Sequence, residues 1–244
     1  NAYPVAPAPT GAIGFTGLPP NLAAGFVDAV SVPAGYTAKV MVSWGDAIGV
    51  AGPNAMVGHD HSDPMPITAA VQGATFGQHN DGMHFFPFAG VGAGSVTNDR
   101  GLLVVNHEYV DPGLHANTAS YGTATITKAL VDAQIAGHGV SVVELRRMGG
   151  KWNVVRPSGF ARRITGATPM TLSGPAAGAD AMKTAADPTG RSVLGTLNNC
   201  AHGITPWGTY LTCEENWNGY FGAKGAFTQT SAERRYGVTA GGFG

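Results

Sequence analysis

Turn-forming residues interrupt this chain along its whole length and divide it into short segments. Of its 244 residues, 37 are glycine and 16 are proline, and they follow neither a collagen-like period nor a low-complexity tract. Tight turns need these two residue types, and helix interiors exclude them. The pattern favours an all-β architecture of short strands joined by turns, such as a sandwich, a barrel or a propeller.

Several segments between the turns have the composition of strands, being rich in β-branched or aromatic residues. They are residues 37–42, 101–106, 140–145, 152–155 and 209–213. A Gly-Gly pair within residues 148–151 predicts a hairpin turn. Residues 125–136 predict one helix, because their apolar residues recur at helical spacing and Gly137 can end it.

Charge and hydropathy argue against two classes of partner. Only 12% of the residues are charged and the formal net charge is -1, so the chain lacks a basic surface for nucleic acid or an anionic membrane. No segment approaches the roughly 20 consecutive apolar residues that span a bilayer. We therefore expect neither nucleic-acid binding nor membrane insertion.

Residues 198–216 collect the side chains that metal sites use. Both cysteines, two adjacent glutamates and a histidine surround a turn at Pro206 and Gly208. The turn predicts that the Asn-Asn-Cys loop folds back towards the strand that carries Glu214 and Glu215. In a regular strand these two glutamates face opposite ways, so both can serve one site only where the strand ends or bulges.

The two cysteines allow two interpretations. Cys200 and Cys213 are an even pair and could form a disulfide in an exported protein. Cys200 follows two asparagines, however, and this polar setting suits a thiolate ligand better than a buried disulfide. We favour Cys200 as a metal ligand and Cys213 as a packing residue.

Further candidates lie at the ends of other predicted strands. Glu108 follows the apolar run at residues 101–106 and is a carboxylate ligand candidate, while Asn106 is a carbonyl ligand or a phosphate donor. Asp81 offers another carboxylate, although such residues also cap turns. Arg162 could bind phosphate through its guanidinium, although paired arginines are more often surface salt-bridge partners.

Two other conspicuous segments have plainer interpretations. Residues 59–63 read His-Asp-His-Ser-Asp between a glycine and a proline, and we favour a solvated loop over a metal site there. Residues 174–178 are rich in glycine but lack the Gly-Lys-Ser/Thr ending of a phosphate-binding loop. We expect a turn at that position.

The block at residues 198–216 resembles the signature of the PhoX family of bacterial alkaline phosphatases. That signature reads approximately Asn-Asn-Cys-Ala-Gly-Gly-x-Thr-Pro-Trp-Gly-Thr-x-Leu-Thr-Cys-Glu-Glu-Asn. Other matches run in the same order at residues 32–36, 44–46, 76–77, 80–81, 102–109, 139–145, 162–166, 168–170 and 173–178. The chain departs from the family at His202, where glycine is usual, and at residues 78–79, where Gln-His replaces Tyr-Asn.

The resemblance implies a fold and a domain organisation. PhoX proteins are elaborated β-propellers with long inserted loops and a few short helices, and they are longer than this chain. We therefore expect residues 32–244 to be the N-terminal portion of a single propeller domain. Residues 1–31 would form an extended arm, since the chain opens on a Pro- and Ala-rich segment that fits what remains after a signal peptide is removed.

The resemblance also implies an activity, the hydrolysis of phosphate monoesters at a cluster of ferric iron (Fe3+) and calcium (Ca2+). Residues and resemblance together predict a ligand set of Asp81, Glu108, Cys200, Glu214 and Glu215, with Asn106 and Arg162 acting on the phosphate. The family is exported by a twin-arginine-type route, so the protein would be a periplasmic or secreted monomer. Two alternatives stay open: a non-catalytic calcium-binding propeller scaffold, and another metal-dependent esterase such as a lactonase or phosphodiesterase.

Overall fold

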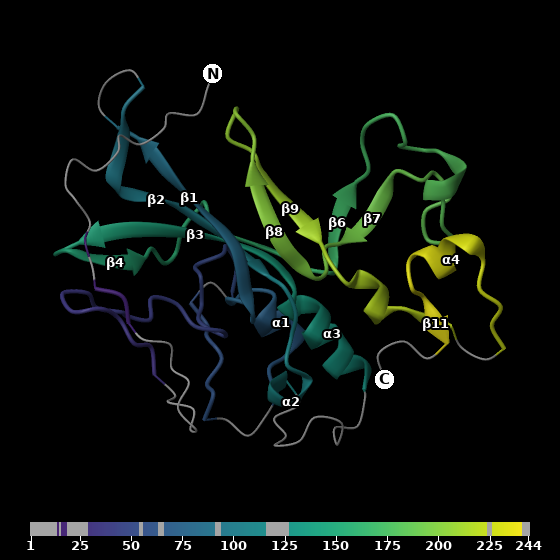
Figure 1. The fold of residues 1–244 in the computed structure, drawn as a ribbon, viewed down its shortest axis with the longest axis horizontal. Coiled ribbons are helices and arrows are strands. Elements are labelled where there is room, and N and C mark those ends of the chain that lie inside the picture. The colour runs from purple at the N-terminus through teal and green to yellow at the C-terminus, as the bar shows by residue number, and fades with distance from the viewer. Residues whose placement is uncertain are drawn as a thin grey trace.

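The computed structural model is mostly β-sheet with a few short helices, which confirms the all-β expectation (Figure 1). It describes residues 14, 16–18, 29–53, 56–62, 66–90, 94–115, 127–223 and 226–240, and the statements below concern these residues. Within them the strands form one larger sheet and three two-stranded units, and no closed barrel or propeller. No helix in this part of the chain has the length and apolar character needed to cross a membrane.

The main sheet is antiparallel and has five strands. They are β1 (Asn80–Ala89), β2 (Val96–His107), β3 (Gly139–Met148), β4 (Lys151–Val154) and β5 (Arg162–Ile164). The order is β1-β2-β3-β4, and β5 pairs with residues 140–142 of β3 while β4 pairs with residues 145–148. Strand β3 is buried on both faces from Gly139 to Leu145, which accounts for its mostly apolar sequence, with Ser141 and Glu144 as buried polar exceptions.

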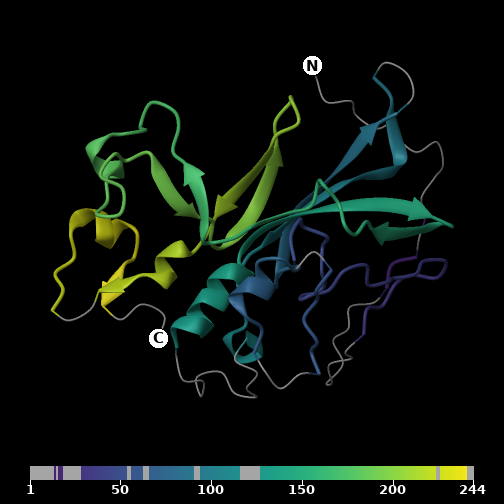
Figure 2. The same cartoon turned by 180° about the vertical axis from the view of Figure 1, so that it is seen from behind.

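Each face of this sheet packs against a different part of the chain, because successive strand residues point to opposite faces. One core cluster consists of Ile48, Phe76, Val105, Val143 and Leu145. The other consists of Val104, Val140 and Val142, with partly buried Phe86, Leu102, Ile164 and Tyr210 around it. Figures 1 and 2 show the helices α1–α3 on one side of the sheet and the β8–β9 hairpin on the other.

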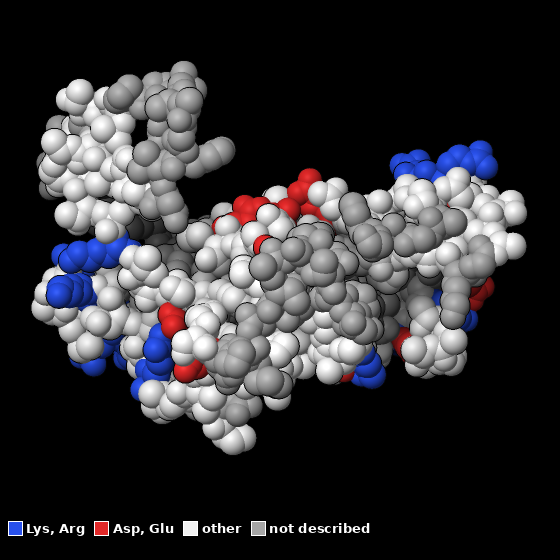
Figure 3. Space-filling view, turned by 90° about the horizontal axis from the view of Figure 1, so that it is seen from below, with Lys and Arg blue, Asp and Glu red and all other residues white. Residues whose placement is uncertain are grey.

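The remaining strands and helices are short. The smaller β units pair β6 (Thr168–Thr171) with β7 (Ser192–Gly195), β8 (Asn199–Ile204) with β9 (Tyr210–Glu214), and β10 (Gly222–Ala223) with β11 (Thr239–Ala240). The α-helices are α1 (Ala69–Gln72), α2 (Pro112–His115), α3 (Lys128–Gly137) and α4 (Ser231–Arg235). Two 3-10 helices cover Asp180–Met182 and Trp217–Tyr220. Figure 3 shows acidic atoms gathered near the middle of one face and basic atoms towards its ends.

Most of the predicted elements are confirmed. Residues 101–106 and 140–145 fall in β2 and β3, and residues 152–155 and 209–213 match β4 and β9 except for one end residue each. The Gly-Gly turn is present, with positive φ at Gly149 and Gly150 as a tight hairpin requires. Helix α3 begins after the N-cap Thr127 and ends at Gly137 as predicted, while the start expected at residue 125 lies outside the described residues.

Two predictions of secondary structure are wrong. Residues 37–42 form no strand, since no described segment pairs with them and Val40 is 84% exposed. The Asn-Asn-Cys segment is not a loop, because Asn199 begins strand β8 and pairs with β9. The reversal between these two strands does follow the turn chemistry, with the amide of Thr205 donating to the carbonyl of Thr209.

Half-buried Arg163 fastens the end of helix α3 to the main sheet. Its guanidinium donates to the carbonyls of Ala136, Gly137, His138, Thr75, Val140 and Ile164, at 2.8–3.2 Å. Three of these carbonyls lie at the C-terminal end of the helix, where such groups lack partners within the helix. His138, which follows the last residue of the helix, donates from Nδ1 of its ring to the carbonyl of Glu108 at 2.9 Å. Through His138 the helix end supports the backbone of a predicted ligand.

Candidate metal centre

Three of the predicted ligands converge although they are far apart in the sequence. One ligand atom from each of Asp81, Glu108 and Cys200 lies within 4.8 Å of the other two. The thiol of Cys200 also makes hydrogen bonds with the carboxylates of Asp81 and Glu215. Three predicted carboxylate ligands therefore meet around the thiol of a fourth.

Asp81 and Glu108 meet because their strands are antiparallel neighbours. Strand β1 starts where β2 ends, with Asn80 opposite His107, so Asp81 and Glu108 lie at the same end of the pair. The amide of Glu108 donates to the carbonyl of His79 at 2.9 Å, which ties the two segments together. The pairing is irregular between Asn80 and Met83, and such irregularities re-aim side chains near sites.

A second irregularity holds Cys200. In the β8–β9 hairpin Asn199 pairs with Glu214 and His202 pairs with Thr212, so Cys200 and Ala201 together face one residue of β9. This two-against-one arrangement is a β-bulge, which bends a strand and changes where its side chains point. The bulge places the Cys200 thiol beside Glu215, the first residue after β9.

Backbone strain gathers at the same place. Within the described residues, three residues other than glycine have positive φ: His79 at 44°, Asn198 at 54° and Asn216 at 49°. Each lies one or two positions from Asp81, Cys200 or Glu215. A left-handed backbone costs energy for residues with a side chain, and such strain clusters at functional sites. Asn198 also accepts a hydrogen bond from the amide of Glu215, at 2.8 Å, through its carbonyl.

The cluster is electrostatically unfavourable without a cation. Burial first, and then the charges of Asp81 and Glu215, raise the pKa of Glu108. Hydrogen bonds to the Asp81 and Glu215 carboxylates, with burial, raise the pKa of the Cys200 thiol to about 12. No lysine or arginine in the described part of the chain counters either shift. Carboxylates and a thiol that repel one another's charge are the donor set that a multivalent cation would compensate.

Comparisons with known proteins identify the family of the chain. The family model for alkaline phosphatase PhoX matches residues 14–244. This chain belongs to the PhoX family. Among solved structures it is similar to Pseudomonas fluorescens PhoX in complex with vanadate, described as a transition state analogue. The identity is 40% and the TM-score 0.75, over 87% of this chain and 34% of that one. A search of curated proteins gives no match.

The chain therefore spans about a third of the length of the solved PhoX chain it matches.

The donor set of the cluster described above fits metal ions of two kinds. A thiolate such as that of Cys200 suits a transition metal such as iron, whereas carboxylate oxygens such as those of Asp81, Glu108 and Glu215 suit calcium as well.

Glu214 lies outside this cluster. Its carboxylate accepts hydrogen bonds from the Thr196 hydroxyl at 2.7 Å and the Leu197 amide at 3.0 Å. The two glutamates face different ways, as strand alternation requires, and the strand ends at Glu214. Glu214 thereby anchors the segment that leads into β8.

Asn106 lies fully buried beneath the Cys200 bulge. Its side-chain amide donates to the carbonyls of Cys200 at 2.8 Å and Ala201 at 3.2 Å. Its side-chain oxygen accepts from the hydroxyls of Tyr210 at 2.9 Å and Thr212 at 3.0 Å. All four hydrogen-bond partners of the Asn106 side chain therefore belong to the β8–β9 hairpin. Asn106 is placed to hold a predicted ligand rather than to reach outwards.

Arg162 is exposed on β5, which β2 and β3 separate from β1. The structure does not bring it into the cluster.

Both cysteines are free, so the disulfide alternative is wrong in this structure. The segment at residues 174–178 is a turn, as expected. Of residues 59–63, the last lies outside the described residues, while half-buried His59 and exposed His61 pack against Trp44.

Sequence reasoning missed the residues that shape this site rather than line it. Asn198 and Asn216 hold strained conformations on either side of the hairpin, and Tyr210 and Thr212 bind Asn106. One signal was available, because asparagine tolerates the left-handed region better than most residues do. The two asparagines before Cys200 and the one after Glu215 could therefore have been interpreted as candidates for a left-handed backbone conformation.

Proposed function

We propose that the protein is a metal-dependent alkaline phosphatase that releases inorganic phosphate from phosphate monoesters. The observation that carries this proposal is the convergence of Asp81, Glu108, Cys200 and Glu215 in a chain of the PhoX family. The related solved protein is described as binding vanadate, a transition state analogue, and that description supports the same reaction class here.

We propose iron (Fe3+) and calcium (Ca2+) as the resident metals. When bound, such cations act as Lewis acids that neutralise charge on the phosphoryl oxygens. Cys200 is the natural ligand for iron, and the carboxylates of Asp81, Glu108 and Glu215 can hold either metal. Metal binding would also keep the Cys200 thiol deprotonated, against the shift that the bare carboxylates impose on its pKa.

Two of the remaining predicted residues have supporting roles in this proposal. Asn106 holds the Cys200 bulge and Glu214 holds the segment before it, since their side chains are committed to those contacts. Arg162 is exposed on β5 outside the cluster, so it has no role in this proposal. We also propose that residues 32–244 belong to a single β-propeller domain of a periplasmic or secreted monomer that is exported by a twin-arginine-type route. Membership of the PhoX family supports these points.

The test uses the full-length protein, purified natively without added metals. Elemental analysis should find both iron and calcium, and phenyl phosphate should be hydrolysed at alkaline pH. Calcium chelation should abolish the activity, and readdition of calcium should restore it. Full activity without iron would remove iron from the proposal. Inactivity with both metals bound would favour a scaffold, and hydrolysis of only diesters or lactones would favour another esterase.

A cysteine pair provides a matched control for the metal assignment. Cys200→Ser removes the thiol at the centre of the cluster, so the protein should lose iron and activity while it stays folded. Cys213→Ser makes the same change at an exposed cysteine of the same hairpin and should keep both. Equal iron contents in the two variants would contradict the assignment.

A further inference from the structure

Four rings form a closed set of contacts along the seam between β1 and the β8–β9 hairpin. We call this set, His84, Phe86, His202 and Tyr210, the ring quartet. His202 stacks on Tyr210 with centroids 5.6 Å apart and planes 12° apart, and it lies 6.2 Å from His84. Phe86 completes the set, 4.7 Å from His84 and 6.4 Å from Tyr210. The two elements therefore share a continuous surface of aromatic rings.

The ring quartet starts directly beside the metal cluster. His202 follows Cys200 by two residues, and Gly82 follows Asp81. The Nδ1 atom of His202 lies 2.8 Å from where a Cβ atom on Gly82 would be, so only a glycine lets the ring lie that close. The Tyr210 hydroxyl donates to the Gly82 carbonyl at 3.0 Å. The backbone that carries Asp81 is thus in contact with the quartet.

His202 is the member of the quartet that a bound molecule can reach. It is exposed, whereas the other three rings are partly buried. Its contacts in the described part of the chain are ring contacts with Tyr210 and His84, and no hydrogen bond to a described residue fixes its ring nitrogens. Tyr210 is held from below by Asn106 and Gly82. An exposed ring therefore lies on one that hydrogen bonds hold in place.

A second stacked pair flanks the cluster and joins its two ligand segments. The rings of His79 and Tyr109 lie 3.6 Å apart with planes 15° apart, next to Asp81 and Glu108 in the sequence. The backbone of His79 is strained and accepts a hydrogen bond from the Glu108 amide. The two rings of this pair stack on each other, whereas His202 stacks on a ring that is partly buried and lies on the hairpin that carries Cys200.

We propose that His202, supported by Tyr210, contacts the organic group of the phosphate monoester and favours flat aromatic or heterocyclic groups. The proposal rests on the proposed function. A phosphoryl group at the cluster carries its organic group outwards, and His202 presents an exposed ring two residues after Cys200. Flat groups stack on aromatic rings with offset geometry and gain from this beyond simple burial. His202 is therefore a specificity-determining residue rather than a ligand of the metal.

The test compares two esters of similar size and leaving-group chemistry that differ in flatness. Benzyl phosphate presents a planar ring, and cyclohexylmethyl phosphate presents a puckered one. The full-length, metal-loaded enzyme should show a higher kcat/KM for the benzyl ester. His202→Gln should reduce that preference by about fivefold to tenfold, mainly through the KM of the benzyl ester, because it keeps a polar group and removes the ring. His202→Phe should keep the preference.

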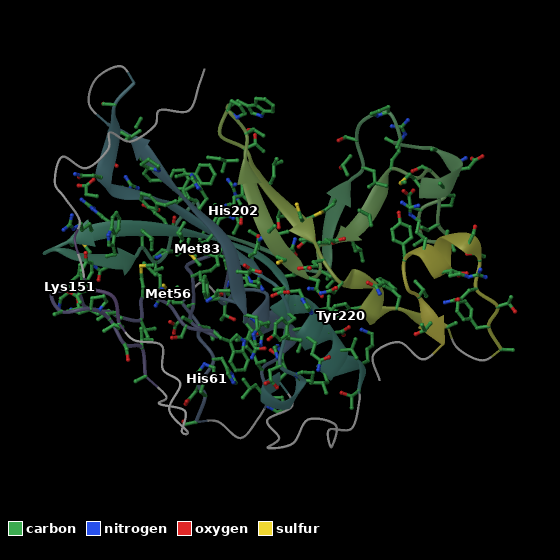
Figure 4. All side chains as sticks on the ribbon, viewed as in Figure 1. Met56, His61, Met83, Lys151, His202 and Tyr220 are labelled. Atoms are coloured by element: carbon green, nitrogen blue, oxygen red, sulfur yellow. The ribbon has the colours of Figure 1, made fainter. Side chains whose placement is uncertain are left out.

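His61→Gln is the matched control. Figure 4 shows His61 on the other side of the main sheet from His202, and His61 is also exposed, so the same substitution there should leave the preference unchanged. Metal content is measured for each variant, and a ratio of two substrates is insensitive to a partial loss of metal. An unchanged preference in His202→Gln, or a preference lost equally in His61→Gln, would overturn the proposal. If the wild-type enzyme hydrolyses no phosphate monoester, the proposed function fails as well.

Discussion

Replacement of Asn106 by alanine should both destabilise the protein and loosen its metal site. The side chain of Asn106 is fully buried and makes four hydrogen bonds, all to the β8–β9 hairpin. Without it, the carbonyls of Cys200 and Ala201 and the hydroxyl of Thr212 lose a partner. The hydroxyl of Tyr210 still donates to the Gly82 carbonyl.

The size of the effect follows from these groups. A buried polar group that loses its partner costs about 1–3 kcal/mol. Three groups are affected, and one of them belongs to the exposed Ala201, which water can reach. We therefore expect the free energy of unfolding to fall by about 3–5 kcal/mol, which is a large part of the roughly 5–15 kcal/mol typical of a domain.

The assay is urea unfolding of the full-length protein with metals present at a fixed excess. Thr212→Val removes one hydrogen bond to Asn106 and one from the side-chain amide of Asn199, and it should cost about 1–2 kcal/mol. The double variant should cost less than the sum, because both changes remove the same contact. Iron content should also fall in Asn106→Ala, since the Cys200 bulge loses its support. A cost below about 1 kcal/mol, with normal iron and a reduced kcat, would show that Asn106 acts on the substrate instead.

Three further outcomes are expected. Burial lowers the pKa of His115 and of His138 to about 4, so the unfolded chain takes up their protons first as pH falls below about 6.5. The free energy of unfolding, measured by urea unfolding between pH 7 and pH 4, should therefore fall by on the order of 3 kcal/mol per histidine. A stability that does not change with pH would contradict this. Arg163→Met should lower the free energy of unfolding by about 3 kcal/mol in the same assay, because six carbonyls lose a donor, while Arg162→Met should change it by less than about 0.5 kcal/mol. Metal removal should lower the melting temperature measured by differential scanning calorimetry, because the clustered carboxylates are then uncompensated, and an unchanged melt would show that metals do not hold this site together.

The identity of most ligands in the site could be predicted from residue chemistry, whereas the direction in which their side chains point could not. Glu108 and Asp81 are predicted from carboxylate chemistry at strand ends and Cys200 from its polar setting and the family resemblance, and the structure brings the three together. Glu214 was included because carboxylates bind metals, yet strand alternation turns it away from Glu215. From the sequence, Glu214 and Glu215 could either face opposite ways or share one site at a strand end. Only the position at which β9 ends decides between these two arrangements.

The rest was hidden because it depends on which segments become neighbours. A bulge exists only relative to a partner strand, so the one at Cys200 and Ala201 is invisible until β8 is paired with β9. The adjacent arginines pose the same problem. Alternation sends Arg163 towards the end of helix α3 and leaves Arg162 in solvent, but nothing in the sequence says which of the two lies inside. Residues 37–42 have strand composition and lack a described partner.

The bulge in β8 makes chain length, rather than side-chain identity, the variable to which this site is most sensitive. Deletion of Ala201 would restore two-residue periodicity through β8 and leave every proposed ligand in the sequence. Either Cys200 or everything after it would then have to turn to the opposite face of the strand. A one-residue indel would thus separate Cys200 from Glu215 or His202 from Gly82, although no functional group had been lost. Among homologous sequences, the spacing between the cysteine and the Pro-Trp-Gly turn therefore says more about an intact site than the cysteine alone.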